Sequence, residues 1–478
     1  MLRSIPSLET PSVALHRAFR VALGDIVSNI VPFAGGRHTT PVPCLAAGLD
    51  YPTPWTRDIS VNTWNGVGLL APEVCRNGLD VVLERDGDGW RVGGQYWDAI
   101  VWAQGAWQLY LYEGDRERLR FAHEVVERSI AFFERTEFDA AVGLFRGPAF
   151  FQDGIAGYPD HCAGSFGSDV RDWVRENGSR RSPVGFGIPW FALSTNCLHA
   201  RAYQLAAAMR AELGLAPEPS LAARHAALRD SIHHRFRLGE GRWAYLLTPE
   251  GRCDHQEGAG LAFLMLFDLV SADEAAAILR HATVLPAGLP CVWPTFPRYA
   301  AFGAGHYGRH AGTVWPHVQA FFADAARRHG RLDRFAHELE QLARRAARDG
   351  QFSEIYHPIT GAIYGGVQED HLDSHLRLWD SVPRTPWGAT GFLRLVISAL
   401  VGLDFTPAGI RFAPCLPAGL GPLVLRGLRY RDAVLTIEVS GHGSLLAACR
   451  IDGAPMSEPF LPAATRGEVH VSLELAPA

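Results

Sequence analysis

Two isolated carboxylates stand in loops rich in glycine, proline and aromatic residues, where acid–base chemistry could take place. Asp153 follows two phenylalanines in the segment 147–160. Glu354 lies between aromatic residues in the segment 352–361, which cannot continue as a regular helix past Pro358. Because apolar surroundings raise the pKa of a carboxyl group, we expect Asp153 to be a general acid near neutral pH. Glu354 could activate a water molecule, although each acid could also belong to an ordinary turn.

A second group combines a stacking face, a hydrogen-bond donor and an acceptor. Trp55, Arg57 and Asp58 stand close together, just before a predicted helix. Sugars are bound by this combination, since hydroxyl groups take bidentate partners and ring faces pack on aromatic side chains. The sequence therefore predicts a sugar-binding platform here. Asp58 could instead cap the helix that follows.

Aromatic side chains recur where predicted loops meet predicted helices. A lone tryptophan usually belongs to a core, but repeated placement at such junctions favours a ligand site. We therefore expect a further set of side chains to contact the substrate. They are Tyr96, Trp97, Asp98, Trp315, His317, Tyr356, Trp379 and Trp387.

Other kinds of chemistry find little support in the sequence. Asp254 and Glu257 flank His255, but their spacing matches no metal-binding signature, so we predict neither a metal nor a cofactor. All 45 residues counted as lysine or arginine are arginine, which excludes a lysine nucleophile or Schiff base. Other acids near aromatic or glycine-rich stretches compete with the two chosen above: Asp98, Asp254, Glu257, Glu369 and Asp370.

The two chosen acids, Asp153 and Glu354, are about 200 residues apart and would lie on different helical hairpins. An inverting glycosidase needs such a pair. One acid protonates the leaving oxygen, and the other, about 6.5–9.5 Å away, deprotonates water on the opposite face of the sugar. The sequence therefore predicts an O-glycosyl hydrolase that acts with inversion on a small carbohydrate.

The elements that must position these residues are mostly helices. Up to residue 403, helices that are apolar all round alternate with amphipathic ones, as in a toroid of helical hairpins with the apolar helices inside. Asp115 and Ser271 are expected N-caps, Pro72 a helix break and Pro316 a first-turn residue. The expected helices span 11–30, 59–84, 95–112, 119–133, 188–213, 221–236, 258–270, 271–281, 312–328, 332–348 and 387–401.

The pattern changes after residue 403. Hydrophobic and polar residues alternate over 435–439 and 469–475, which predicts half-buried antiparallel strands. We therefore divide the chain into a helical catalytic domain, 1–403, and a small antiparallel β-sandwich domain, 404–478. The second domain carries no obvious chemistry, so we expect it to be structural, with sugar binding as the alternative.

Composition excludes several classes of protein. With 478 residues, 47% of them hydrophobic and 20% charged, the chain can bury a large core. A formal net charge of -5 and the lack of a basic stripe argue against nucleic-acid binding. No window of 18 apolar residues predicts a membrane span. The eight cysteines form no CxxC pair and the first residues contain no apolar stretch, so we expect free thiols and a cytoplasmic location.

The chain resembles the six-hairpin, (α/α)6-barrel glycoside hydrolases, which include trehalases, processing α-glucosidases and bacterial amylo-α-1,6-glucosidase-like proteins. The resemblance extends over about residues 15–475. The four segments that carry it are WTRD at 55–58, GTVWP at 312–316, EIYHPITG at 354–361 and GIRFAPCLP at 409–417.

The resemblance implies roles for individual residues. The general base of the trehalase and processing-glucosidase group is the Glu of a Glu-x-Tyr-x-Pro-x-Thr-Gly segment, which Glu354 matches. Asp153 is the counterpart of the general acid, although Gln152 to Ile155 replace the Asp-Asn-Ser-Pro run of the processing glucosidases. Arg57 and Asp58 would hold the sugar in the −1 subsite. An α-glucoside is the implied substrate class.

Three other functions remain open on this fold. A sugar phosphorylase would use phosphate in place of water, with Arg298, Arg309 and His310 as its cradle. A lyase or epimerase would use Tyr, His or Arg side chains and would keep activity without Glu354. A non-catalytic carbohydrate-binding barrel would bind sugars without turnover.

Overall fold

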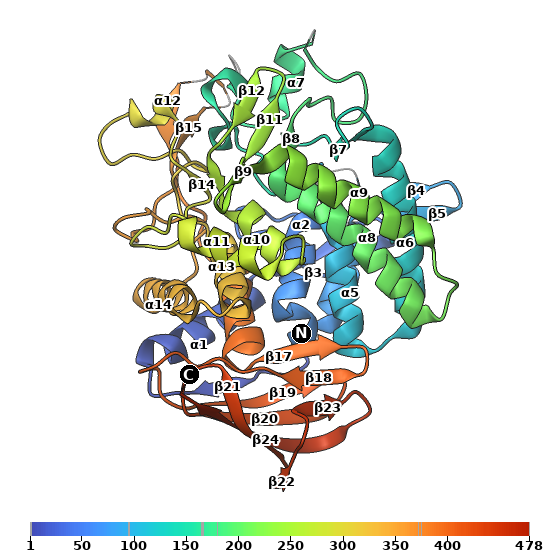
Figure 1. Ribbon diagram of the computed structural model, residues 1–478, viewed down its shortest axis with the longest axis vertical. Coiled ribbons are helices and arrows are strands. Elements are labelled where there is room, and N and C mark those ends of the chain that lie inside the picture. The colour runs from blue at the N-terminus through green and yellow to red at the C-terminus, as the bar shows by residue number, and fades with distance from the viewer. Residues whose placement is uncertain are drawn as a thin grey trace.

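The computed structural model describes residues 2–93, 96–163, 167–178, 180–370, 372–373 and 375–477. Figure 1 shows helices over most of the molecule and the strands β17 to β24 gathered at one end. Both main elements that the sequence predicts, a mostly helical part and a C-terminal sheet, are present. The first residue of the helix predicted over 95–112, Gln95, lies outside the described residues.

Six helices have most of their residues buried. They are α2 (Thr56–Asn62), α5 (Trp102–Glu113), α8 (Leu193–Leu213), α10 (Gly258–Leu266), α13 (Pro316–Arg328) and α15 (Pro386–Arg394). In this order each helix contacts the next, and α15 contacts α2 again. We call these six the inner helices. The series of contacts closes on itself, so the N-terminal ends of the inner helices can bring distant segments of the chain together.

A second set of helices packs against the inner helices. They are α1 (Val13–Ser28), α4 (Pro72–Val81), α6 (Arg116–Thr136), α9 (Pro219–Phe236), α11 (Ala272–His281) and α14 (Leu332–Asp349). Each contacts at least one inner helix: for example, α6 packs on α5 and α8, and α14 packs on α13. The predicted alternation of buried and amphipathic helices is therefore confirmed for these pairs.

Local signals in the sequence set several helix ends correctly. Asp115 caps α6 by accepting the backbone N–H of Arg118 at 2.9 Å. Ser271 and Glu274 form a reciprocal capping box at the start of α11. Pro316 occupies the first turn of α13, and the helix predicted over 59–84 is indeed interrupted before α4 at Pro72.

The interruption before α4 is larger than proline alone predicts. Residues Thr63–Val67 form the π-helix η1, within which Gly66 has a φ of 120°. A left-handed backbone of this kind favours glycine. The short helix α3 (Gly68–Leu70) follows, and a second π-helix, η5 (Leu395–Leu400), continues α15.

Three inner helices begin later than their hydrophobic patterns predict. The segment 95–112 contains η2 (Ala99–Val101) and then α5. The segment 188–213 contains a short strand before α8, and the segment 312–328 contains a loop before α13. Buried loops are as apolar as buried helices, so the periodicity could not separate them. The residues gained by these loops include three of the predicted site residues, Tyr96, Asp98 and Trp315.

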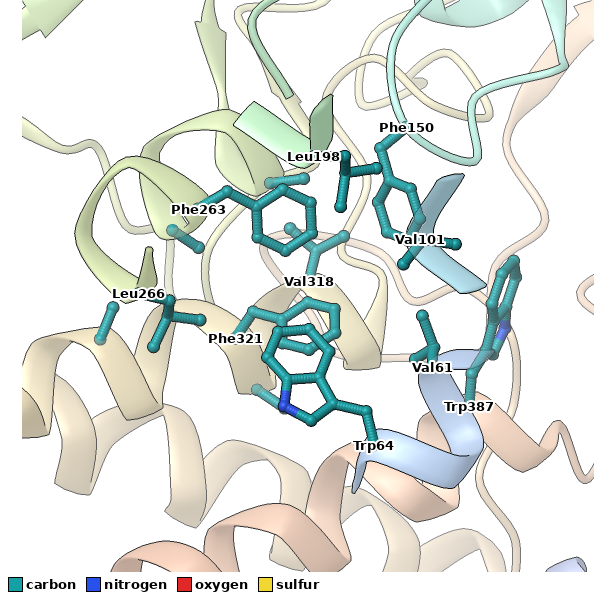
Figure 2. Packing of buried hydrophobic residues seen from close by; sticks show 14 of the residues in the cluster. Val61, Trp64, Val101, Phe150, Leu198, Phe263, Leu266, Val318, Phe321 and Trp387 are labelled. Carbon is teal, nitrogen blue, oxygen red and sulfur yellow. The ribbon is translucent and has the colours of Figure 1, made fainter. Parts of the chain in front are cut away.

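The space between the inner helices is filled by aromatic and aliphatic side chains (Figure 2). The ring of Trp64 stacks on that of Phe321 with centroids 4.8 Å apart, and Phe263 packs at 5.4 Å from Phe321. Figure 2 shows Val61, Leu198 and other residues from several inner helices converging on the same cluster. Burying each large side chain contributes about 1.5–3 kcal/mol, so this cluster stabilises the arrangement of the helices.

The C-terminal strands form two sheets. The larger has the order β1-β19-β20-β24-β21-β22 and the smaller the order β17-β18-β23. The strands of the larger sheet are β1 (Ser7–Glu9), β19 (Leu423–Tyr430), β20 (Asp432–Ser440), β21 (Leu445–Ile451), β22 (Ala454–Pro455) and β24 (Arg466–Ala476). Those of the smaller sheet are β17 (Leu403–Thr406), β18 (Gly409–Phe412) and β23 (Phe460–Pro462).

The prediction that the strands are antiparallel is wrong for one pair. β20 and β24 are parallel, with Leu435 opposite Val469, whereas β19 and β20 are antiparallel. The alternating pattern predicts which face of a strand is buried, but it says nothing about the direction of its neighbour. The strand β1 also joins this sheet from the other end of the chain. The boundary at residue 403 stays a prediction.

Short helices and hairpins connect the long elements. The short helices are η3 (Ile155–Gly157), η4 (Asp160–Cys162), α7 (Asp172–Glu176) and α12 (Pro297–Ala300). The short strands are β2 (Ile30–Gly35), β3 (His38–Leu45), β4 (Leu83–Asp86), β5 (Gly89–Val92), β6 (Phe138–Asp139), β7 (Leu144–Phe145), β8 (Phe191–Ala192), β9 (Arg237–Gly239), β10 (Arg242–Trp243), β11 (Leu246–Thr248), β12 (Gly251–Cys253), β13 (Gln256–Glu257), β14 (Val292–Trp293), β15 (Val367–Glu369) and β16 (Leu376–Leu378).

Two further expectations can be compared with the structure. All eight cysteines are free and buried, which confirms the prediction of free thiols. Among the described helices, none is both long enough and apolar enough to cross a bilayer.

Candidate active site

Most of the predicted site residues stand at or before the N-terminal ends of inner helices. Trp55 immediately precedes α2, and Asp98 precedes η2 and α5. Trp315 immediately precedes α13, and Trp387 lies in the first turn of α15. Helix N-termini carry a partial positive charge, so carboxylates are favoured at this end of the inner helices.

Arg57 lies at the centre of a cluster of carboxylates. Its Nη2 donates to Oδ2 of Asp153 at 2.7 Å, across 96 residues of sequence. Its Nη1 is 3.9 Å from Asp98 and its Nε is 3.8 Å from Asp58. The guanidinium also lies 3.9 Å from the ring centroid of Tyr96. The structure thus brings together residues that the sequence placed on three separate segments.

Asp58 does not cap α2. Trp55 is the N-cap residue, while Asp58 lies in the first turn and faces Arg57. Burial raises the pKa of Asp58 to about 8, although Arg57 opposes this shift. Burial also raises the pKa of Asp98, again against the effect of Arg57. One oxygen of each, Oδ2 of Asp58 and Oδ1 of Asp98, has no hydrogen-bond partner among the described residues.

The expectation of a raised pKa for Asp153 is wrong. Burial alone would raise the pKa, but Arg57, His310 and Arg171 together outweigh burial, and the pKa lies below its ordinary value. The aromatic residues before Asp153 in the sequence suggested an apolar environment. The nearest group in space is instead a guanidinium, from a segment that the local sequence could not identify.

The loop that carries Asp153 is held in an unusual conformation. Phe151 has a φ of 55°, a left-handed backbone that is costly for a residue with a side chain. Its N–H donates to Asp98 at 2.7 Å, and its carbonyl accepts from the N–H of Asp153 at 2.9 Å. Strain of this kind concentrates at functional sites, so Phe151 is a site residue that our sequence analysis missed.

Trp97 supports this loop. It is wholly buried, and its indole N–H donates to the carbonyl of Ala149 at 3.0 Å. Its side chain also fills the space beside Gly147, where an added Cβ would come within 2.9 Å of it. Trp97 thus has a structural role, and its contact with substrate stays a prediction.

Glu354 lies on a second loop and has its own arginine. Its side chain is buried, and its Oε2 accepts a hydrogen bond from Nη2 of Arg309. The other guanidinium nitrogen, Nη1, donates to the carbonyls of Gly365 at 2.9 Å and Asp380 at 3.0 Å. Burial raises the pKa of Glu354, the cation of Arg309 lowers it, and the net shift is upward.

Tyr356 positions this second loop. Its hydroxyl accepts the N–H of Ser353 at 2.8 Å, and Arg345 lies 4.5 Å from its ring centroid. The ring is buried, and through Ser353 it supports the backbone next to Glu354, while its contact with a sugar stays a prediction. The N–H of Glu354 itself donates to the carbonyl of Val382 at 2.9 Å.

The two loops meet at one site. The negative charge of Asp153 acts on Glu354, and both carboxylates act on the hydroxyl of Tyr51. Tyr51 packs on Trp55 with ring centroids 5.0 Å apart. Asp153 is the more accessible of the two acids, with 27% of its side chain exposed. The arrangement presents one carboxylate that is partly exposed to solvent, Asp153, and a second that is more deeply buried, Glu354.

Aromatic side chains enclose the site. The ring of Phe151 lies 5.0 Å from Trp315 and 4.4 Å from His317, and His317 stacks on Trp387 at 4.2 Å. Trp379 is half-buried and lies 5.8 Å from the Arg309 guanidinium. Burial holds the pKa of His317 well below its ordinary value, so the ring is neutral. Neither of its nitrogens has a hydrogen-bond partner in the described part of the chain.

Arginine and histidine residues proposed for a phosphate cradle do not form one. Arg298 donates to Glu369 at 3.0 Å and to Asp160 at 2.7 Å, so its charge is already compensated. Arg309 is bound to Glu354, and burial lowers the pKa of His310 to about 3, which leaves the ring neutral.

Glu257, one of the acids that compete with Asp153 and Glu354 in the sequence, is buried. One of its oxygens accepts a hydrogen bond from the N–H of Ser194 at 3.1 Å.

No group of three or more metal-ligating side chains occurs in the ranges that the structure describes. The sequence analysis missed Tyr51 and Phe151, and it named Arg309 and His310 only for phosphate. Tyr51 stands in the same short segment as Trp55, which could have identified it. Nothing in the local sequence links Arg309 to Glu354.

A family profile, the mannosylglycerate hydrolase MGH1-like glycoside hydrolase domain, matches residues 98–372. The chain belongs to this family. The matched region includes both Asp153 and Glu354. The predicted resemblance to the six-hairpin glycosidases is thereby confirmed. No curated protein sequence matches the chain.

Solved structures of glycosidases share the fold. A GH63 mannosylglycerate hydrolase from Thermus thermophilus, in complex with glucose, superimposes with a TM-score of 0.58 at 16% identity, over 79% of this chain and 99% of that one. A sialidase gives 0.65 at 15% identity, over 95% and 40% of the two chains. A GH78 rhamnosidase from a Bacillus species gives 0.61 at 12%, over 100% and 44%. The chain thus spans less than half the length of two of these proteins.

Proposed function

We propose that this protein is an inverting glycoside hydrolase in which Asp153 is the general acid and Glu354 the general base. The observation that carries the proposal is the pairing at one site of two carboxylates from distant loops, each bound to its own buried arginine. The family to which the chain belongs and the Glu-x-Tyr-x-Pro-x-Thr-Gly segment around Glu354 support the same assignment.

The proposed reaction uses the two acids on opposite faces of the sugar. Asp153, once protonated, gives its proton to the glycosidic oxygen as the bond to the anomeric carbon breaks. Glu354, as a carboxylate, takes a proton from the attacking water, whose oxygen forms the new bond. The more exposed position of Asp153 suits contact with the leaving group, which must depart toward solvent.

Unpaired polar atoms around the site support a polyhydroxylated ligand. The Nε and Nη1 atoms of Arg57, Oδ2 of Asp58, both nitrogens of His317 and Nε1 of Trp387 lack hydrogen-bond partners within the described residues. Buried polar atoms are normally paired, so those of His317 and Trp387 fit the hydroxyls of a bound sugar and the water that precedes it. The aromatic rings beside them suit the faces of a pyranose.

We further propose an α-glucoside as the leading substrate class, because of the resemblance to trehalases and processing glucosidases. An α-mannoside is the next candidate, since a structural relative is a mannosylglycerate hydrolase. We propose that the inner helices form the inner ring of an (α/α)6 barrel, which their closed series of contacts supports. The free thiols support our expectation of a reducing, cytoplasmic environment.

The test is an NMR time course on a panel of α- and β-linked glucosides and mannosides, including mannosylglycerate. Wild type, Asp153→Asn and Glu354→Gln are compared. We expect one substrate to yield the inverted anomer first, and both variants to lose at least about a hundredfold in kcat. Release of the retained anomer would contradict inversion, and full activity of Glu354→Gln would contradict the assigned base.

A further inference from the structure

The resting state of the site does not match the reaction proposed for it. A general acid must carry a proton, yet Asp153 accepts a hydrogen bond from Arg57 at 2.7 Å, as an ionised carboxylate does. The partner is well fixed: Arg57 is only 2% exposed and its guanidinium packs on Tyr96. A substrate that met this state would find the acid already deprotonated.

Arg57 has a second set of partners within reach. Asp58 and Asp98 lie 3.8 and 3.9 Å from its guanidinium nitrogens, just beyond hydrogen-bond distance. One oxygen of each, Oδ2 of Asp58 and Oδ1 of Asp98, is bound by no described residue. The Nε and Nη1 atoms of Arg57 also have no hydrogen-bond partner among the described residues. A small movement of the guanidinium would therefore exchange Asp153 for these two carboxylates without leaving the cation unpaired.

We propose that Arg57 has two positions, on Asp153 in the empty site and on Asp98 and Asp58 when a neutral sugar is bound. The sugar hydroxyls displace the guanidinium from Asp153, and Asp153 then takes a proton from solvent through its exposed side. That proton is the one later given to the glycosidic oxygen. Arg57 is thus a positioning residue that couples protonation of the acid to occupancy, and this role rests on the proposed function.

The electrostatic surroundings agree with this account. Burial is the largest single influence on the pKa of Asp153 and raises it, while Arg57, His310 and Arg171 together lower it below its ordinary value, so movement of Arg57 away from Asp153 should raise the pKa. Besides Arg57, several groups face Asp153. From helix α2 this is Asp58, and from the surrounding loops they are Tyr51, Tyr96, Asp98, Tyr158, Arg171, His310 and Glu354. Arg171 is a second cation, but it is bound to Asp169.

The pH dependence of turnover tests this proposal. The alkaline limb of kcat/KM lies at the higher of the Asp153 and Glu354 pKa values in the free enzyme, and that of kcat marks loss of the proton from Asp153 in the complex once its pKa has risen above that of Glu354. We expect the alkaline limb of kcat in wild type to lie at least about one pH unit above that of kcat/KM, since a neighbouring arginine lowers a carboxyl pKa by about 1–3 units. Coincident limbs in the wild-type enzyme would overturn the proposal.

Substitutions of Arg57 and Asp98 test the two proposed positions of the Arg57 guanidinium one at a time. In Arg57→Gln the limb of kcat/KM should move up to meet that of kcat. Asp98→Asn keeps an acceptor for the N–H of Phe151 but weakens the second position, so the separation of the limbs should shrink and kcat should fall. The matched control is Arg171→Gln, which removes a nearby cation that is not bonded to Asp153 and should move both limbs equally.

Two failures can be told apart. If no glycoside of the panel is hydrolysed, the proposed function is wrong and this proposal falls with it. If a glycoside is hydrolysed but Asp98→Asn leaves the separation of the limbs unchanged, only the second position of Arg57 is contradicted. Should Arg57→Gln fail to fold, Arg57→Lys retains the charge and should retain the separation.

Discussion

At the C-terminal ends of the inner helices, a buried aspartate is fully paired. Asp324 on α13 accepts from Arg394 at 2.6 and 3.0 Å and from Arg327 at 2.9 and 3.2 Å, so both of its oxygens are bound. Burial alone would raise its pKa, but the surrounding arginines hold it well below the ordinary value. Arg394 also packs on Trp64 at 4.3 Å.

At the N-terminal ends of the same helices, a buried arginine and its aspartates are paired only in part. Arg57 makes one short bond, to Asp153, and lies 3.8 Å from Asp58. Burial raises the pKa of Asp58 to about 8, the opposite direction from Asp324. The residue types are the same at both ends; the number of hydrogen bonds that they complete is not.

The difference separates stability from function. A complete network rigidifies the fold and has no capacity left for a ligand, whereas an incomplete one is costly until a ligand completes it. The incomplete network coincides with aromatic surfaces and with the loops of Asp153 and Glu354. This is the physical reason for assigning the N-terminal end as the active site.

The largest expected effect on stability comes from breaking the complete network. Asp324→Asn leaves Arg394 and Arg327 without a buried counter-charge and should lower the free energy of unfolding by about 3–5 kcal/mol. The matched variant Asp58→Asn replaces a buried carboxyl group that has one oxygen without a hydrogen-bond partner among the described residues, and should lower the free energy of unfolding far less than Asp324→Asn does. Urea unfolding measures both. Equal losses would erase the proposed difference between the two ends.

A second prediction concerns Glu257, a buried acid at the N-terminal end of α10 that has no ion-pair partner among the described residues. Burial raises its pKa to about 8, so the folded state binds a proton that the unfolded state has released. Stability from this group is present at acidic pH and is lost as the pH rises toward 8. Glu257→Gln should reduce the loss of unfolding free energy between pH 5.5 and 7.5 by about 2 kcal/mol.

Thermal or urea unfolding of the wild-type protein and of Glu257→Gln at pH 5.5 and pH 7.5 tests whether Glu257 titrates in this range. The amide can still accept the N–H of Ser194, so the variant should fold. An identical pH dependence of wild type and Glu257→Gln would show that Glu257 does not titrate in this range.

The smallest expected effect lies away from both ends. Ser271→Ala removes the capping box of α11 and should cost about 1 kcal/mol in unfolding free energy, without changing kcat. Asp115→Ala at the start of α6 is the matched case. A loss of activity in either variant would show that the outer helices influence the site more than their positions indicate.

The sequence predicts those features that depend on near neighbours. Asp115, Ser271 and Pro316 mark helix starts through bonds or sterics within one turn, and each is found where expected. The parallel pairing of β20 and β24 was not predicted, because the direction of a neighbouring strand depends on the path of the chain between them.

The candidate site shows the same limit. The types and loop positions of Asp153 and Glu354 identified them, but their pKa shifts depend on Arg57 and Arg309, which are 96 and 45 residues away in sequence. Trp97 and Tyr356 were assigned to substrate because aromatic residues near loops can serve either role. Only their hydrogen bonds to the loop backbones show that they position the acids.

One measurement tests the central claim most directly. The α-glycosyl fluoride of the sugar identified by the panel releases fluoride without protonation of the leaving group, so it needs a base but no general acid. We predict that Asp153→Asn hydrolyses this fluoride within about tenfold of wild type, while Glu354→Gln loses at least about a hundredfold. Retained activity of Glu354→Gln together with loss in Asp153→Asn would contradict the assigned roles of the two acids.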